Sequence, residues 1–182
     1  MATVLIYYGT SEGQTAKIAR HIGASLAERG LEVELVESPA VPPLPLDAYR
    51  AVLVGDSIHV GNYHRPVMKF IAAHQETLAK RPNGFFSVCL AAASKKPEEQ
   101  AKAKAFVDEM MTQTQWHPDR VAVFAGGIAY SKYGLLKTWL MKRIAKSDMG
   151  DVDTSRDYEY TDWDSVEAFA NGFCEDLLRR AA

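Results

Sequence analysis

Residues 3–15, TVLIYYGTSEGQT, join an apolar run to a short loop that contains glycine and is rich in hydroxyl side chains. The β-branched and aromatic residues of Thr3–Tyr8 predict a strand. Apolar side chains at every fourth position predict a helix over Gln14–Arg29, and Gly30 is placed to end it. A strand, a tight loop and a helix in this order begin an α/β domain.

The same alternation continues along the 182-residue chain. Leu31–Glu37 alternates apolar and charged residues, as a strand at a sheet edge does. Two later runs have the continuous apolar pattern of buried parallel strands, Ala51–Gly55 and Gly84–Ala91, and Val121–Gly126 is expected to be the fifth strand. Further helices are expected from Pro66, over Pro97–Thr114, and after a capping threonine and acids at 161–164.

These elements predict a single α/β domain over residues 1–182, with three layers and a doubly wound parallel sheet of five strands. The alternating second strand favours the order 2-1-3-4-5. An extra helical insertion, at about 129–157, follows the fifth strand. Ligands of such sheets bind beyond the carboxyl ends of the strands.

Composition excludes several classes of protein. A formal net charge of -2 argues against binding through overall charge to nucleic acid, and we predict no nucleic-acid partner. Cys89 and Cys174 lie far apart without a Cys/His cluster, so we expect no metal site and a reducing compartment. The N-terminus lacks the features of a signal peptide, and no apolar run reaches the roughly 18 residues of a membrane span. A cytoplasmic location is therefore expected.

The loop after the first strand is the predicted phosphate site. It presents backbone N–H groups and hydroxyls at a helix N-terminus, where an anion is favoured. It contains no Lys or Arg, and it is neither the GxxxxGK(S/T) loop of nucleoside triphosphates nor the GxGxxG loop of dinucleotides. A neutral cradle suits a single phosphate ester such as that of FMN; the alternative is a turn that uses Ser and Thr only as helix starters. The predicted contacts are Thr10, Ser11, Glu12, Gly13, Gln14 and Thr15.

Two more loops are expected to hold the flavin ring. In the segment DSIHVGNYH (56–64), the predicted contacts are Ser57, Ile58, His59, Val60, Gly61, Asn62 and Tyr63. Around AAASKK (91–96), the predicted contacts are Leu90, Ala91, Ala92, Ala93 and Ser94. The second loop has no aromatic side chain. Either one flavin face is therefore open to a substrate, or Tyr130 or Tyr133 covers it.

No catalytic residue is assigned. His59 and His64 are the candidates for moving a proton, because imidazole titrates near neutral pH. Asp56 is a candidate base on the same segment. The alternative, which we favour, is that both histidines are structural and have satisfied hydrogen bonds. The hydride chemistry would belong to the flavin.

The insertion contains a basic amphipathic segment. Gly134–Ser147 has helical spacing, and residues 131–147 carry basic side chains without an acid. Such a segment can lie on an anionic membrane or attract carboxylates; the alternative is a packed helix with a solvated lysine face. The candidate contacts with substrate or membrane are Lys132, Lys137, Trp139, Lys142, Arg143 and Lys146.

Several segments resemble the menaquinone-dependent protoporphyrinogen IX dehydrogenases of bacterial haem synthesis: GTSEGQT, DSIHVGNYH, QWHPDRVAVFAGGIAYSKY, MKRIAKSDMGDVDTSRD and YTDWDSVEAFA. The likeness runs from Val4 to about Phe173. Thr10, Gly13 and Thr15 also match the flavodoxin loop (S/T)-x-(S/T)-G-x-T, in which Glu12 here replaces a hydroxyl residue.

This resemblance implies a flavodoxin-like fold, an FMN cofactor and the oxidation of protoporphyrinogen IX to protoporphyrin IX. It implies that electrons pass to a membrane quinone, menaquinone or ubiquinone, with peripheral contact at the cytoplasmic face of the inner membrane. The alternatives are a flavodoxin-type electron carrier that binds redox partner proteins, and an FMN quinone reductase using NAD(P)H. Carriers are usually strongly acidic around the flavin, so the basic insertion, Lys95 and Lys96 favour the enzyme.

Overall fold

The computed structural model describes residues 3–128 and 158–180. Its centre is a five-stranded parallel sheet with the order β2-β1-β3-β4-β5, which confirms the predicted topology. The predicted insertion at about 129–157, with its helix, lies outside the described residues. The strands are β1 (Thr3–Tyr8), β2 (Glu32–Glu37), β3 (Ala51–Ser57), β4 (Asn83–Cys89) and β5 (Arg120–Ala125).

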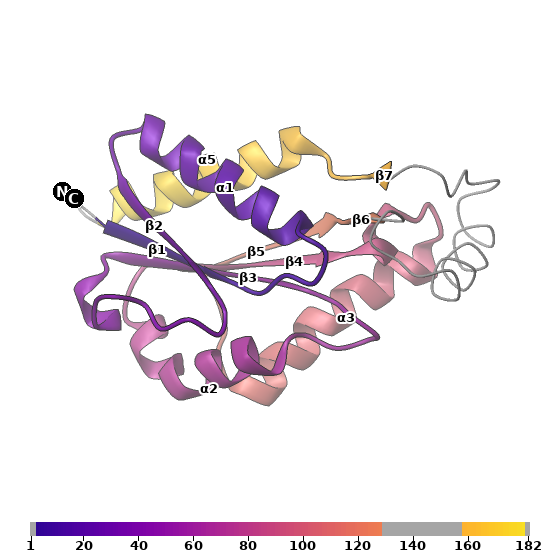
Figure 1. Ribbon diagram of the computed structural model, residues 1–182, viewed down its shortest axis with the longest axis horizontal. Helices are drawn as coiled ribbons and strands as arrows, with labels where there is room; N and C mark the ends of the chain where they lie inside the picture. The colour runs from indigo at the N-terminus through magenta and orange to yellow at the C-terminus, as the bar shows by residue number, and fades with distance from the viewer. Residues whose placement is uncertain (1–2, 129–157, 181–182) are drawn as a thin grey trace.

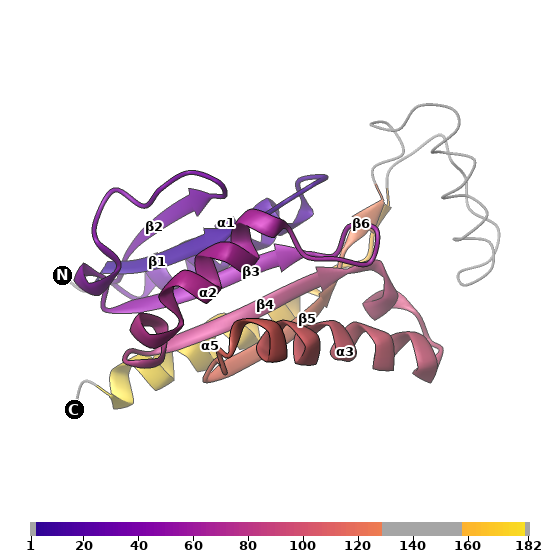
Figure 2. The same cartoon turned by 90° about the horizontal axis from the view of Figure 1, so that it is seen from below.

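Helices cover both faces of the sheet (Figures 1 and 2). On one face lie α1 (Gln14–Glu28) and α5 (Trp163–Arg179); on the other lie α2 (Arg65–Ala79) and α3 (Pro97–Thr114). Short 3-10 turns occur at η1 (Leu46–Ala48) and η2 (Leu90–Ala93), and a small antiparallel pair is formed by β6 (Gly127–Ile128) and β7 (Tyr158–Glu159).

The core lies on both sides of the central strands β1, β3 and β4, whereas the apolar run of β5 forms an edge strand in which only Phe124 is buried. Side chains of β1 alternate between the two faces, so Ile6 packs with α1 and α5 whereas Leu5 packs with α2 and α3. The edge strand β2 keeps only Val36 buried, as its charged alternation predicts. None of the described helices combines the length and the apolar character needed to span a membrane.

The end of α1 and the start of α5 test the predicted helix boundaries. Gly30 has a φ of 81°, and the N–H groups of Gly30 and Leu31 reach the carbonyls of Ala27 and Leu26, as in a Schellman motif. This confirms the predicted stop of α1. At the start of α5 the expected threonine cap is wrong. Asp162 caps the helix, because its Oδ1 accepts from the N–H groups of residues 164 and 165.

Two strand ends differ from the prediction. β3 continues past Gly55 because Asp56 and Ser57 still pair with β4, so Asp56 lies in the sheet and is fully buried. β4 ends at Cys89, the last residue paired with β5, and the chain then turns into η2. The β6–β7 pair was not expected, because two residues per strand are too few to show an alternating pattern.

Candidate functional site

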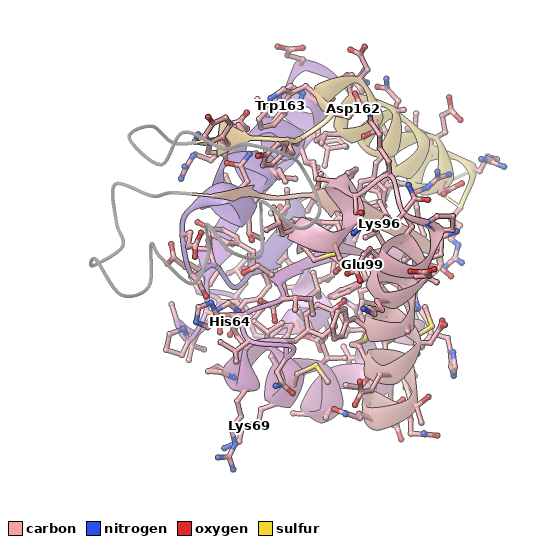
Figure 3. The ribbon with its side chains drawn as sticks, turned by 90° about the vertical axis from the view of Figure 1, so that its right-hand side faces the viewer. His64, Lys69, Lys96, Glu99, Asp162 and Trp163 are labelled. Atoms are coloured by element: carbon pink, nitrogen blue, oxygen red, sulfur yellow. The ribbon has the colours of Figure 1, made fainter. Side chains whose placement is uncertain are left out.

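The predicted site segments meet at the carboxyl edge of the sheet. The loop after β1, the loop after β3 and the η2 turn after β4 all leave the sheet at this edge. Figure 3 views the molecule from this edge and labels His64, the residue before α2, and Lys96, the residue before α3. This is the edge where open α/β sheets bind their ligands.

The loop Thr10–Thr15 forms a tight turn into α1. The N–H of Gly13 donates to Thr10 Oγ1 at 3.0 Å, and Gly13 has a φ of 96°, a conformation that favours glycine. Thr15 is buried, and its hydroxyl has no hydrogen-bond partner among the described residues. A buried, unpaired hydroxyl beside the free N–H groups of a helix start fits an anion that is bound from outside the chain.

Two other side chains of this loop are tied to distant segments. Gln14 Nε2 donates to Thr161 Oγ1 at 2.8 Å, and that hydroxyl donates to the carbonyl of Ala125, also at 2.8 Å. Ser11 is exposed, and its Oγ lies 2.8 Å from His64 Nε2. The loop is therefore braced by the segment before α5, which is tied to the end of β5, and by the start of α2. Glu12, which lies between Ser11 and Gln14 in the sequence, is half-buried.

Asp56 is the buried acidic side chain of the site. Its carboxylate accepts from the N–H groups of Ser57 and His64, each at 2.8 Å, and Oδ1 lies 2.5 Å from His64 Nδ1. Burial raises the pKa of Asp56, and these hydrogen bonds act against that rise. The hydrogen bond to Asp56 raises the pKa of His64. Gly9 leaves the necessary room, since a Cβ there would lie 2.5 Å from Asp56 Oδ1.

The segment after β3 forms a narrow hairpin. The backbones of His59 and Asn62 exchange hydrogen bonds of 2.9 and 3.2 Å, and Val60 and Gly61 both have positive φ, at 50° and 77°. For a β-branched residue such as Val60 this backbone conformation is an outlier. Val60 is 84% exposed and His59 is also exposed, while Ile58 N–H donates to the carbonyl of β4 residue 88.

Tyr63 and Ser57 lie deeper than the hairpin. The Tyr63 hydroxyl donates to Ser87 Oγ at 2.8 Å, its ring packs edge-on against Phe85, and burial raises the pKa of its phenol. The phenol is thus engaged inside the domain. The Ser57 hydroxyl is buried without a hydrogen-bond partner in the described part of the chain, like that of Thr15.

The η2 turn offers small side chains. Leu90 and the three alanines after it are partly buried, whereas Ser94 is buried. Ser94 Oγ accepts from the N–H of Lys96 at 3.2 Å, and its carbonyl accepts from Gln100 Nε2, which fixes the turn to α3. Tyr130 and Tyr133, and the predicted contacts from Lys132 to Lys146, lie outside the described residues.

Sequence reasoning missed Gly9, Thr161 and the connection among Ser11, His64 and Asp56. The positions of Ser11 and His64 are 53 residues apart, and no local motif links them. The one sequence feature that could have indicated the link is a potentially charged histidine eight residues after an acid in a buried strand.

The amino-acid sequence is similar to those of known proteins. A family model described as a flavodoxin domain matches residues 5–155. The protoporphyrinogen IX dehydrogenase (quinone) of Escherichia coli K12 is 33% identical over 167 residues, which cover 91% of each chain. The protein of the same name from Leishmania major is 31% identical over 93% of this chain and 73% of its own length.

The chain belongs to the protoporphyrinogen IX dehydrogenase family. This membership confirms the resemblance seen in the sequence and makes the chain a flavodoxin-type oxidoreductase. A short-chain flavodoxin associated with a bacterial microcompartment aligns over 100% of both chains, with a TM-score of 0.62 and 14% identity. An archaeal flavodoxin aligns over 96% of the present chain and 98% of its own chain, with a TM-score of 0.54 and 16% identity. At these identities the two structures support the fold alone.

Proposed function

We propose that the chain binds FMN and oxidises protoporphyrinogen IX to protoporphyrin IX, with electrons passed to a quinone, in haem biosynthesis. The names of its relatives in Escherichia coli and Leishmania major support this substrate and acceptor. The structural observation that carries the proposal is the anion cradle at the start of α1, where Thr15 holds a buried hydroxyl without a partner among the described residues.

The cradle suits the phosphate of FMN. Thr10 fixes the turn through Gly13, and the first N–H groups of α1 have no partner within the helix. The hydroxyls of Ser11 and Thr15 add donors from the same loop. A phosphate at this point meets the positive end of the helix dipole without a Lys or Arg in the loop.

The ring site is proposed between the segments after β3 and β4. The predicted contacts are residues 57–63 on one side and Leu90–Ser94 on the other. Bound FMN supplies the electron acceptor, and the protein supplies position and surroundings. The partly buried side chains of Ala91–Ala93 are small, which suits a flat tetrapyrrole approaching one face of the ring.

We extend the proposal to the location of the protein. The basic residues from Lys132 to Lys146 would draw the protein towards an anionic membrane that holds the quinone, menaquinone or ubiquinone. They would also attract the carboxylates of the porphyrinogen. The protein would then work in the cytoplasm, in peripheral contact with the inner membrane.

An anaerobic assay tests the reaction. The FMN-loaded protein is mixed with protoporphyrinogen IX and a menaquinone analogue, and porphyrin fluorescence is followed. We expect a rise that needs both protein and quinone. Reactions without quinone, and with protein freed of FMN, are the controls. A flavin-loaded protein that gives no rise above the rate without protein would contradict the proposal and leave an electron carrier or a quinone reductase.

A further inference from the structure

Three side chains from separate segments form a continuous hydrogen-bonded chain at the phosphate loop. Ser11 Oγ lies 2.8 Å from His64 Nε2, and His64 Nδ1 lies 2.5 Å from Asp56 Oδ1. Ser11 is exposed, His64 is about three-quarters buried, and Asp56 is fully buried. This series of hydrogen bonds therefore runs from the sheet outwards to the predicted phosphate site.

We propose that His64 supplies the positive charge opposite the FMN phosphate and acts on it through Ser11, with Asp56 hydrogen-bonded to its other ring nitrogen. The inference rests on the proposed FMN binding and goes further, since it assigns a counter-charge to a loop that contains no Lys or Arg. His64 is a positioning residue in this scheme and takes no part in electron transfer.

The protonation state of His64 decides what the Ser11 hydroxyl can do. With both ring nitrogens protonated, Nε2–H donates to Ser11 Oγ, and the hydroxyl hydrogen is free to be donated to a phosphate oxygen. With neutral His64 and Nδ1–H facing Asp56, Nε2 becomes an acceptor and takes the hydroxyl hydrogen. Loss of one proton from His64 thus removes its positive charge and also the Ser11 hydroxyl as a donor to the phosphate.

The pair is built into the fold. Asp56 is held by backbone N–H groups of its own segment, and a buried carboxylate is stable only with such partners. Gly9, directly after β1, provides space: a Cβ there would lie 3.0 Å from His64 Nδ1 and 2.8 Å from Val67 of α2. A position that must lack a side chain for the pair to form supports a specific role for the pair.

The charges around His64 favour its cationic form. Asp56 faces it from β3, and the side chain that α2 contributes nearby is the apolar Val67. Glu12 lies in the loop beside Ser11, and Arg65 follows His64 at the exposed start of α2. The phenol of Tyr63 is engaged by the hydroxyl of Ser87. Of these groups, Asp56 is the one that raises the pKa of His64, and a phosphate would raise it further.

The pH dependence follows from two titrations. A phosphate ester gains its second negative charge above about pH 6. His64 loses its positive charge as pH rises through its raised pKa. FMN affinity should therefore be greatest between these two steps and fall as His64 deprotonates, whereas riboflavin, which has no phosphate, should show neither dependence.

The experiment measures dissociation constants of FMN and riboflavin for the apoprotein by flavin fluorescence, from about pH 6 to about pH 9. Wild type is compared with His64→Gln, with Ser11→Ala, and with His117→Gln as the matched control. His117 is exposed between α3 and β5, at the opposite edge of the sheet. Circular dichroism of each apoprotein reports folding.

For His64→Gln we expect FMN affinity about ten- to a hundredfold weaker at neutral pH, as for loss of a charged hydrogen bond. Its alkaline fall in affinity should also disappear, while riboflavin affinity stays unchanged. Ser11→Ala keeps the cation, so its loss should be smaller, about three- to tenfold, with the pH dependence retained. His117→Gln should match wild type.

A second measurement does not depend on any variant. The His64 imidazole is titrated by NMR in wild-type protein, free and with each flavin bound. FMN should move its titration to higher pH, and riboflavin should not.

If FMN binds tightly but His64→Gln leaves its affinity and pH dependence unchanged, or the titration does not move, this inference fails and FMN binding stands. If wild-type protein binds neither flavin, the inference and the proposed function both fail.

Discussion

The two ends of the sheet carry similar polar residues and use them differently. At the amino edge, Asn83 and Asp119 exchange hydrogen bonds of 2.8 to 3.1 Å, and Arg180 donates to the same carboxylate. At the carboxyl edge, the hydroxyls of Thr15 and Ser57 are buried without a hydrogen-bond partner in the part of the chain described.

We interpret these polar groups differently: those of the amino edge hold the fold together, and the two carboxyl-edge hydroxyls belong to the proposed binding site. Asn83 is 1% exposed and also donates to the carbonyls of Leu78 and Arg81, so it closes the start of β4. Burying a hydroxyl without a partner costs free energy, which a binding site recovers when the ligand arrives. We therefore expect substitutions at the amino edge to change stability and substitutions at the proposed site to change affinity.

The largest effect is expected at the amino edge. Asn83→Ala removes a side-chain donor from the carbonyls of Leu78 and Arg81 and from the Asp119 carboxylate, which should lower the free energy of unfolding by about 2–3 kcal/mol. Urea unfolding of the apoprotein measures this, with the exposed Gln113→Ala as control. FMN affinity of the folded variant should not change. Weakened affinity in the folded variant would show that the two edges are not independent.

A smaller and opposite pattern is expected at the carboxyl edge. Thr15→Val removes an unpaired buried hydroxyl with little change of shape, so the apoprotein should be as stable as wild type or more stable by up to about 1 kcal/mol. FMN affinity should fall about tenfold, the size of one lost hydrogen bond. Urea unfolding and flavin fluorescence give the two values, with the exposed Thr112→Val as control. Unchanged affinity would place the phosphate elsewhere.

The smallest effect is expected at the rim of the amino edge. Arg179 is 72% exposed and donates to Asp176, which also pairs with Arg120 at 2.7 Å. Arg179→Ala should lower stability by less than about 0.5 kcal/mol, and salt should reduce even that. Urea midpoints at low and high salt measure it. A loss as large as that of Asn83→Ala would mean that exposed pairs also hold this edge.

Local patterns in the sequence were enough to predict the fold and the position of the candidate site. Apolar runs and helical spacing were enough for the strand order, and the loop Thr10–Thr15 marked the carboxyl edge. Both are local patterns, which the chain shows without knowledge of its partners. The stop at Gly30 is of the same kind, because one residue with positive φ ends the helix.

Contacts between distant residues could not be predicted in this way. Asn83 meets Asp119 only once the register of β4 against β5 is fixed, and Ser11 meets His64 only once the register of β1 against β3 is fixed. The burial of Asp56 depends on two extra residues of pairing between β3 and β4. The small side chains of η2 gave no local pattern for the turn. Such features depend on tertiary structure, where a family resemblance helps more than periodicity.

The brace between Gln14 and Thr161 sets an order of events during protein synthesis. The two residues are 147 positions apart, so the phosphate loop leaves the ribosome long before the segment that holds it. A nascent chain that ends before residue 161 has the complete loop sequence but lacks the hydrogen bond from Thr161 to the carbonyl of Ala125. A pause in translation before residue 161 therefore leaves this loop without its brace.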